Sequence, residues 1–226
     1  MSNFYIVSTP IGNLSDITLR ALEILRSVDL ILCEDTRVTK KLLDHFGIKT
    51  PVLSYHQHSK LRKVEYIIQL LKEEKNLALV SDAGTPGISD PGSKLINLAI
   101  EQCSNLTVIP IPGASAVTVA ASISGFPMDK FLFLGFPPKK RKRKKFFEEV
   151  LNSKYPVIFY ESPYRILKTL KQLRSTFGVR SSEFEIVVAR ELTKKFETIY
   201  RGKIEEVIKE IEKDKIKGEF VVIVGK

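Results

Sequence analysis

The chain has 226 residues, of which 43% are hydrophobic and 27% are charged. It is therefore long enough to bury one large core or two smaller ones, and its composition excludes a wholly disordered protein. The formal net charge is +10, and seven positive charges form one run: Lys139, Lys140, Arg141, Lys142, Arg143, Lys144 and Lys145. Because these charges repel one another, we expect a mobile loop or a frayed helix start that contacts a polyanion; a merely solubilising surface is the alternative.

Cysteine and histidine content argues against disulfides and metal sites. Cys33 and Cys103 have no closely spaced partner, which favours a reducing, cytoplasmic compartment. His56 and His58 lack the additional carboxylate or cysteine ligands that a metal site requires. The N-terminus has no signal-peptide pattern, and prolines and a glycine interrupt the uncharged stretch 104–128, so we expect no membrane span.

Short apolar runs rich in β-branched residues alternate with amphipathic stretches, the pattern of an α/β protein with a largely parallel sheet. Thr18 is suited to cap the first helix, and Gly47 to end the second. In the first half the pattern predicts strands near 4–8, 29–33, 51–54, 77–81 and 106–109, and helices near 18–27, 36–46, 59–75, 92–103 and 114–123.

The stretch 124–130 has the composition of a linker, so we predict an N-terminal α/β domain over 1–124 and a C-terminal α/β domain over 125–226. The short polar turn between 185–190 and 197–201 indicates a hairpin, and the second sheet is therefore expected to be mixed. The pattern of the second half predicts strands near 131–135, 156–160, 185–190, 197–201 and 219–225, and helices near 145–153, 163–176 and 203–213.

Loops that leave strands are the expected ligand sites, because open α/β sheets bind ligands outside the carboxyl ends of their strands. Residues 81–92 contain three glycines, two prolines, two aspartates and three hydroxyl side chains, far more than a plain turn needs. Loop 8–16 lacks a dinucleotide-binding fingerprint. The alternative to a ligand site there is a simple strand-to-helix turn capped by Asp16 or Thr18. Loop 110–116 presents backbone amides at a helix start, which suits a carboxylate.

Two further segments carry charged side chains where strands end. Glu34, Asp35 and Arg37 follow the second strand and are candidates to bind substrate or move a proton. A helix cap with a compensating arginine is the alternative explanation of the same residues. In the second half, the loop 159–165 includes Glu161 and is a further candidate ligand site; its alternative is a purely structural role, in which Ser162 caps a helix and Pro163 lies in the first turn.

These loops, in this order, resemble the tetrapyrrole methylase family of S-adenosylmethionine-dependent methyltransferases over essentially the whole chain. Porphyrin-acting members carry Gly-Asp-Pro where this chain has Gly84-Thr85-Pro86, so the likeness is to the RNA-modifying branch. The resemblance implies two α/β domains with the cofactor in the cleft between them, and a homodimer. The segments that carry it are Ser8–Thr18, Cys33–Arg37, Asp82–Gly92, Tyr160–Pro163 and Ala189–Thr193.

The same resemblance implies methylation of a cytidine ribose 2′-hydroxyl in the decoding region of small-subunit (16S) ribosomal RNA, as naked RNA or as the 30S subunit. Residues 139–145 would then bind RNA phosphates. Rival functions are a small-molecule methylase acting on a corrin or porphyrin precursor, and a non-catalytic RNA- or ribosome-binding protein. A positioned base or a cationic neighbour would assist such a reaction, and the candidate catalytic residues are Glu34, Asp35, Arg37 and Glu161. The implied cofactor contacts are Pro10, Gly84, Thr85, Ile88, Ser115, Ala116, Tyr160, Ala189, Arg190 and Glu219.

Overall fold

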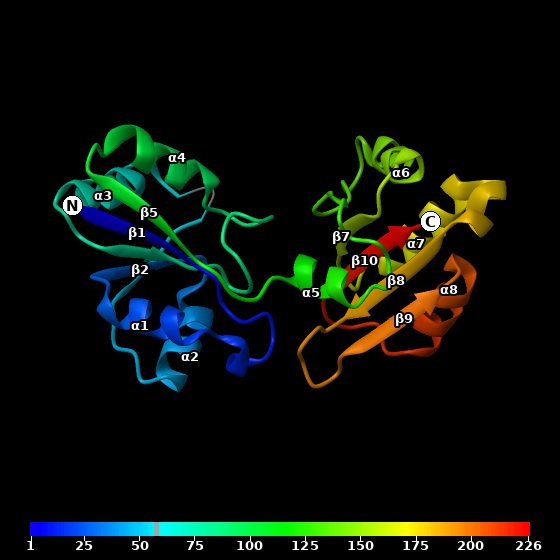
Figure 1. Ribbon diagram of the computed structural model, residues 1–226, viewed down its shortest axis with the longest axis horizontal. Helices are drawn as coiled ribbons and strands as arrows, with labels where there is room; N and C mark the ends of the chain where they lie inside the picture. The colour runs from blue at the N-terminus through cyan, green and yellow to red at the C-terminus, as the bar shows by residue number, and fades with distance from the viewer. Residues whose placement is uncertain (57–58) are drawn as a thin grey trace. The chain divides into compact units, whose positions relative to one another are not determined.

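A computed structural model describes residues 1–56 and 59–226 and divides into two units, Met1–Ser115 and Ala116–Lys226 (Figure 1). The boundary falls before the expected one after residue 124, because helix α5 (Ala116–Ser122) packs against strands of the second unit. The ring of Phe126 also packs closely on Gly225, where an added Cβ would lie 2.7 Å from it. The stretch expected to be a linker therefore belongs to the second unit.

The first unit is built on a fully parallel five-stranded sheet in the order β3-β2-β4-β1-β5, which confirms the predicted parallel sheet. Strands β2 and β4 are continuous apolar runs, as expected for strands covered on both faces. The strands are β1 (Ser2–Val7), β2 (Leu30–Cys33), β3 (Val52–Ser54), β4 (Leu77–Leu79) and β5 (Leu106–Ile111).

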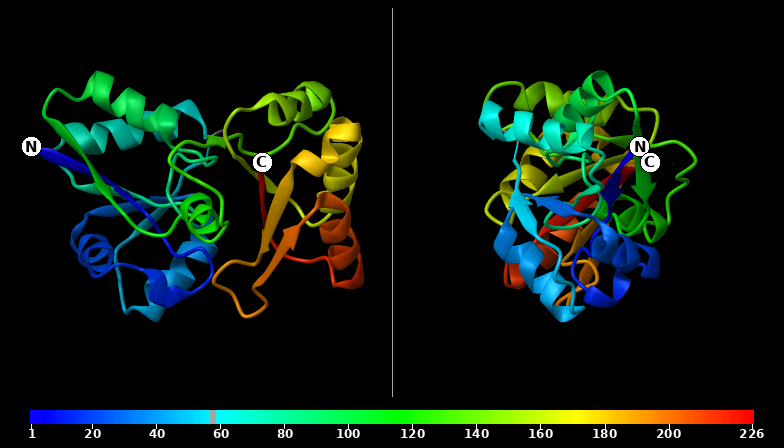
Figure 2. Two further views of the ribbon diagram at one scale, coloured as in Figure 1. Left: turned by 45° about the vertical axis from the view of Figure 1, so that its right-hand side comes forward. Right: turned by 90° about the vertical axis from the view of Figure 1, so that its left-hand side faces the viewer.

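Helices cover both faces of this sheet (Figure 2). Alternate strand residues separate the two cores: Ile31 packs with residues of α1 and α2, whereas Leu32 packs with residues of α3 and α4. Thr18 caps α1 by accepting a hydrogen bond from the Ala21 amide at 3.1 Å, and Gly47 follows α2 with a φ of 63°, both as predicted. These helices are α1 (Leu19–Ser27), α2 (Thr36–His45), α3 (Leu61–Lys72) and α4 (Ser93–Gln102).

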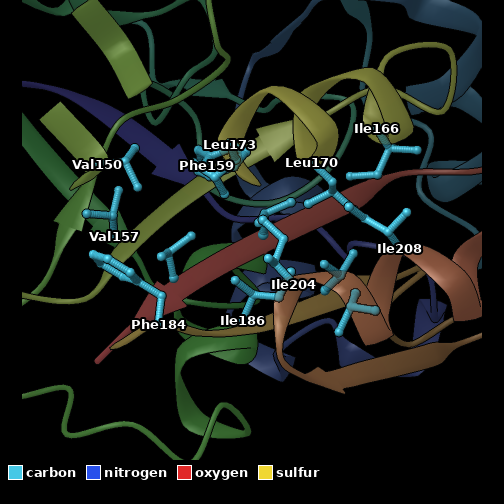
Figure 3. Close-up of a cluster of buried hydrophobic side chains, with 14 of the residues drawn as sticks. Val150, Val157, Phe159, Ile166, Leu170, Leu173, Phe184, Ile186, Ile204 and Ile208 are labelled. Carbon is cyan, nitrogen blue, oxygen red and sulfur yellow. The ribbon is translucent and has the colours of Figure 1, made fainter. Parts of the chain in front are cut away.

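The second unit has a mixed five-stranded sheet in the order β6-β7-β10-β8-β9, and its β8–β9 pair is the predicted hairpin. A single large core fills the space between this sheet and three helices, with Phe159, Leu170 and Ile204 among its members (Figure 3). The elements are β6 (Leu132–Phe133), β7 (Val157–Glu161), β8 (Glu185–Arg190), β9 (Thr198–Gly202), β10 (Phe220–Gly225), α6 (Arg143–Asn152), α7 (Ile166–Phe177) and α8 (Ile204–Lys213).

Local differences from the predicted elements occur at helix starts. The prediction that Ser162 and Pro163 begin a helix is wrong, because residues 162–165 form a turn and α7 begins at Ile166. The Ser162 carbonyl accepts from the amides of Arg165 and Ile166, both at 3.0 Å, while the Ser162 amide donates to Glu161. Two short 3₁₀ helices, η1 (Leu14–Asp16) and η2 (Gly178–Glu183), were not predicted. Among the described residues, no helix is both long and apolar enough to cross a membrane.

Candidate functional site

Four of the predicted loops lie at one edge of the first sheet. Because all five strands run parallel, the loops that follow them leave from the same edge. The order β2-β4-β1-β5 makes the loops after these strands immediate neighbours in space. The structure therefore brings together segments that are up to about 100 residues apart in sequence.

The loops after β1 and β4 are joined by a short backbone bridge. The amide of Thr9 donates to the carbonyl of Gly84 at 2.9 Å, and the Gly84 amide donates back to Thr9 at 3.0 Å. The Thr9 hydroxyl donates to the Ser81 carbonyl at 3.1 Å, and the Ser81 hydroxyl donates to the Gly84 carbonyl at 3.1 Å. Gly84 has a φ of 84°, which other residues adopt only with strain. The glycine-rich loop is thus fixed at its first turn.

Thr85 joins this pair of loops to the loop after β5. Its hydroxyl lies 2.9 Å from the Ser8 hydroxyl and donates to the Ala114 carbonyl at 3.3 Å. Gly113 allows this approach, since a Cβ there would lie 2.9 Å from that of Ser8. Of the residues implied as cofactor contacts, Gly84 and Thr85 therefore lie against Ala114, which directly precedes Ser115. Pro10 is buried on the β1 loop, and the side chain of Ile88 is 46% exposed.

Three carboxyl groups influence one another beside these loops. Burial is the main cause that raises the pKa of Glu34 to about 7, and the charges of Asp90 and Asp82 add to it. Burial also raises the pKa of Asp90 to about 6, against a hydrogen bond from Ser81 that lowers it. A carboxyl group with a pKa near neutrality is suited to accept a proton at physiological pH. Within the described ranges, no group of three or more His, Cys, Asp or Glu residues is arranged to hold a metal ion.

Asp35 and Arg37 form the cap that was the alternative explanation for this segment. Asp35 is the N-cap of α2 and accepts from the Arg37 amide at 2.8 Å. The Arg37 guanidinium forms an ion pair with the same carboxylate at 2.6 Å, while its own side chain is 86% exposed. These hydrogen bonds lower the pKa of Asp35 to about 2. Asp35 is therefore held in its charged form by Arg37, whereas the pKa of Glu34 is raised towards neutrality.

A pocket of about 280 Å³ opens at the same edge, between the β1 loop, α2 and the start of the β4 loop. Sequence reasoning missed the α2 residues that line it, although Val38 and Leu42 are four positions apart and so share one helix face. Its polar lining includes the carboxylate of Asp82, which also accepts from the Asp35 amide at 3.1 Å. The complete lining consists of Thr9, Pro10, Leu14, Val38, Thr39, Lys41, Leu42, Ser81 and Asp82.

In the second unit, Glu161 ends β7 and is only 1% exposed. Its Oε1 accepts from the Arg165 guanidinium at 2.7 Å and from the Ser162 amide at 2.7 Å, and its Oε2 accepts from the Thr169 hydroxyl at 2.6 Å. A carboxylate with this many partners is held as a buried ion pair. These contacts indicate that Glu161 has a structural role within the second unit.

The other residues implied for the second unit differ in accessibility. Tyr160 is half-buried and packs edge-to-face against Phe136, with their ring centroids 5.3 Å apart. Ala189 is fully buried, and the Arg190 guanidinium donates to Asp214 and to the Lys217 carbonyl, both at 2.9 Å. Glu219 is exposed and pairs with Lys194. Of these four residues, Glu219 is therefore the most accessible and Ala189 the least.

The basic run is mostly exposed, but one of its residues, Arg143, is packed and does not belong to a loose loop or frayed helix start. Arg143 is only 9% exposed because it begins α6 and points into the unit. Its guanidinium donates to Gln172, Pro138 and Thr169 at distances between 2.6 and 3.0 Å, and it lies over the Phe147 ring. The six exposed cations are Lys139, Lys140, Arg141, Lys142, Lys144 and Lys145.

Comparison with known proteins gives consistent matches over the whole chain. Residues 3–208 match the family Tetrapyrrole (Corrin/Porphyrin) Methylases. The chain is 44% identical to ribosomal RNA small subunit methyltransferase I of Thermotoga maritima over 100% of this chain and 99% of that protein. It is 47% identical to the protein of the same name from Mycoplasmopsis pulmonis, over 99% and 97% respectively. Cobalt precorrin-4 methyltransferase, a cobalamin biosynthetic enzyme, shares the fold with a TM-score of 0.71 and 18% identity, covering 99% of this chain and 94% of that one.

Proposed function

The chain belongs to the tetrapyrrole methylase family, and on that premise we propose that it methylates ribosomal RNA with S-adenosylmethionine as the methyl donor. The observation that carries this proposal is the set of three loops joined at Thr85, in a chain matched along its length by ribosomal RNA methyltransferases. Methyltransferases of this family use S-adenosylmethionine in general. The names of the ribosomal RNA methyltransferases that match this chain are the basis for proposing ribosomal RNA as the methyl acceptor.

The residues of the first unit fit such a cofactor. An amphipathic ligand requires backbone donors and apolar contacts in one place. Gly87 leaves open space where a side chain would project, and the exposed Ile88 beside it offers an apolar surface. We assign Pro10, Gly84, Thr85, Ile88 and Ser115 of the first unit to cofactor binding. From the second unit we assign Ala116, Tyr160, Ala189, Arg190 and Glu219.

For the acceptor we propose the 2′-hydroxyl of a cytidine in the decoding region of small-subunit RNA. When bound, the cofactor supplies an electrophilic methyl group, and the protein has to hold the hydroxyl in line with it. Orientation of this kind can contribute roughly 7 kcal/mol or more to lowering the barrier. A ribose hydroxyl is a weak nucleophile, so a positioned base adds about 10²-fold or more.

Glu34 is the residue we propose as this base. Its raised pKa leaves it able to exchange a proton near neutral pH. Asp35 is held charged by Arg37, and Glu161 is occupied by its three partners, so their contacts support positioning roles instead. Among the four candidate catalytic residues, Glu34 is therefore the one whose chemistry fits proton transfer.

The six exposed cations of the basic run are proposed to bind RNA phosphates. Phosphates repeat along an RNA strand, so a run of exposed cations can contact several of them in succession, which favours the RNA substrate over a compact corrin or porphyrin precursor. The family resemblance also implies a homodimer, which sedimentation velocity at several concentrations would test.

The function is tested by incubating the protein with labelled S-adenosylmethionine and small ribosomal subunits, then mapping the labelled nucleotide. We expect label on one cytidine ribose. Label on a base would refute the 2′-hydroxyl assignment. Calorimetric binding of the cofactor without RNA labelling would favour the small-molecule methylase, and absence of cofactor binding would favour the non-catalytic RNA- or ribosome-binding protein.

A further inference from the structure

Glu161 is the centre of a buried network in the second unit that the proposed reaction does not use. Through Oε1 it holds the guanidinium of Arg165 at 2.7 Å, and through Oε2 it accepts from the Thr169 hydroxyl at 2.6 Å. The same Thr169 oxygen accepts from the Arg143 guanidinium at 2.6 Å. One carboxylate thus fixes two arginines, the first directly and the second through a hydroxyl.

Each of these arginines donates to the backbone just before the exposed cations. Arg165 Nη1 lies 3.0 Å from the carbonyl of Pro137, and Arg143 Nη1 lies 3.0 Å from that of Pro138. We call the exposed residues that follow, Lys139–Lys142, the basic segment. The basic segment is fixed at both ends, since Pro138 precedes it and Arg143 begins α6 directly after it.

We propose that Glu161, Arg165, Thr169 and Arg143 are positioning residues that hold the basic segment in one conformation for the phosphates of single-stranded RNA. This inference rests on the proposed RNA-methylating function. A free loop of like charges would lose conformational entropy on binding RNA, and a loop already held by hydrogen bonds loses less. Arg143 therefore acts on RNA through the basic segment, and Glu161 acts through the two arginines.

Substitution of Arg143 by lysine distinguishes positioning from direct phosphate binding. Lysine keeps the positive charge but cannot donate to three separate acceptors in a planar fork. If Arg143 touched phosphate, Arg143→Lys would bind RNA as the unaltered chain does. If it positions the basic segment, the substitution weakens phosphate binding by the neighbouring lysines, which are themselves unchanged.

The measurement is the affinity for a fluorescein-labelled single-stranded RNA oligonucleotide at a series of salt concentrations. Each bound phosphate contributes ~0.7 to the slope of log K against log salt for a single strand, which at about 0.1 M salt is about fivefold in affinity. We expect Arg143→Lys to release at least two phosphates, a weakening of about 25-fold. The matched control Lys144→Gln removes one exposed charge and should weaken binding about fivefold.

A buried substitution can also unfold the protein, so a second pair of variants is compared. Thr169→Val removes the hydroxyl that links Arg143 to Glu161, and Thr169→Ser keeps it. We expect Thr169→Val to show the reduced slope and Thr169→Ser to retain the parent slope, both with folded circular-dichroism spectra. Parent-like slopes for Arg143→Lys and Thr169→Val would overturn the positioning role alone. Absence of salt-dependent RNA binding by the unaltered chain would overturn the proposed function and this inference with it.

Discussion

Replacing Glu34 by glutamine should make the protein more stable and less active, in a pH-dependent manner. In the folded chain, burial and then the neighbouring Asp90 and Asp82 raise the Glu34 pKa from 4.5 to about 7. The folded state therefore binds this proton more tightly than the unfolded state does. Between about pH 4.5 and 7 the unfolding free energy of the parent falls as pH rises. Above about pH 7 the ionised Glu34 destabilises the folded state by its full amount.

The magnitude follows from the two pKa values. At about 1.4 kcal/mol per pH unit, the difference between 4.5 and about 7 corresponds to about 3 kcal/mol. Because the Glu34 side chain remains partly exposed, solvent screening reduces this to roughly 1–2 kcal/mol. Glutamine cannot ionise, so Glu34→Gln should exceed the parent by this amount near pH 8 and equal it near pH 4.

Urea unfolding at a series of pH values measures this difference. Asp35→Asn is the matched control, because the pKa of Asp35 is lowered to about 2, chiefly by its hydrogen bonds with Arg37. Asparagine remains a good helix cap, so this variant loses the charge and its ion pair with Arg37 but keeps the cap. Its effect has the opposite sign: Asp35 contributes stability above its unfolded pKa, and that stability is lost as pH falls towards about 2.

Methyl transfer to small ribosomal subunits is measured over the same pH range. With Glu34 as base, the parent rate rises through about pH 7, and Glu34→Gln loses about 10²-fold or more. A stability difference between parent and variant that is constant from acid to alkaline pH would refute the assigned ionisation. Retained activity in Glu34→Gln would refute the assigned base.

Three further substitutions test other parts of the site. Thr85→Val removes the hydrogen bonds with Ser8 and Ala114 and should weaken S-adenosylmethionine binding by about fivefold in calorimetry, since loss of a hydrogen bond costs ~1 kcal/mol. Gly113→Ala places a Cβ 2.9 Å from that of Ser8 and should lower the unfolding free energy by about 1–3 kcal/mol in urea. Neutralising the exposed cations should reduce the slope of log K against log salt for RNA binding by ~0.7 for each phosphate that is no longer bound. An unchanged slope would show that these cations do not bind RNA phosphates. The cations to neutralise are Lys139, Lys140, Arg141, Lys142, Lys144 and Lys145.

The elements of the fold were predictable because burial and periodicity agree along most of the chain. The run Leu77–Leu79 is apolar throughout and forms a central strand, while α1 buries Ala21, Leu22 and Leu25 at helical spacing. The domain boundary was not predictable in the same way. Helix α5 is apolar enough to pack on either sheet, and only its contacts with the second unit's strands assign it there.

The position of the site followed from one rule about parallel sheets, but the chemistry of its carboxyl groups did not. Glu34 and Asp35 are adjacent and follow the same strand. Asp35 caps α2 and pairs with Arg37, whereas Glu34 is affected by burial and by the charges of Asp90 and Asp82, about 50 residues away in sequence. Only the folded arrangement gives one carboxyl a pKa of about 2 and its neighbour a pKa of about 7.

The basic run and the residues after it have a helical periodicity that a count of charges does not detect. Arg143, Phe146, Phe147 and Val150 recur at the spacing of one buried helix face, and all four are buried in α6. Helical periodicity thus separates Arg143 from its six exposed neighbours before any contact is known. Burial of an arginine requires partners for its donors, and Gln172, Thr169 and the Pro138 carbonyl provide them. A charged residue on the apolar face of a predicted helix is therefore evidence for a buried network, and here that network ends at Glu161.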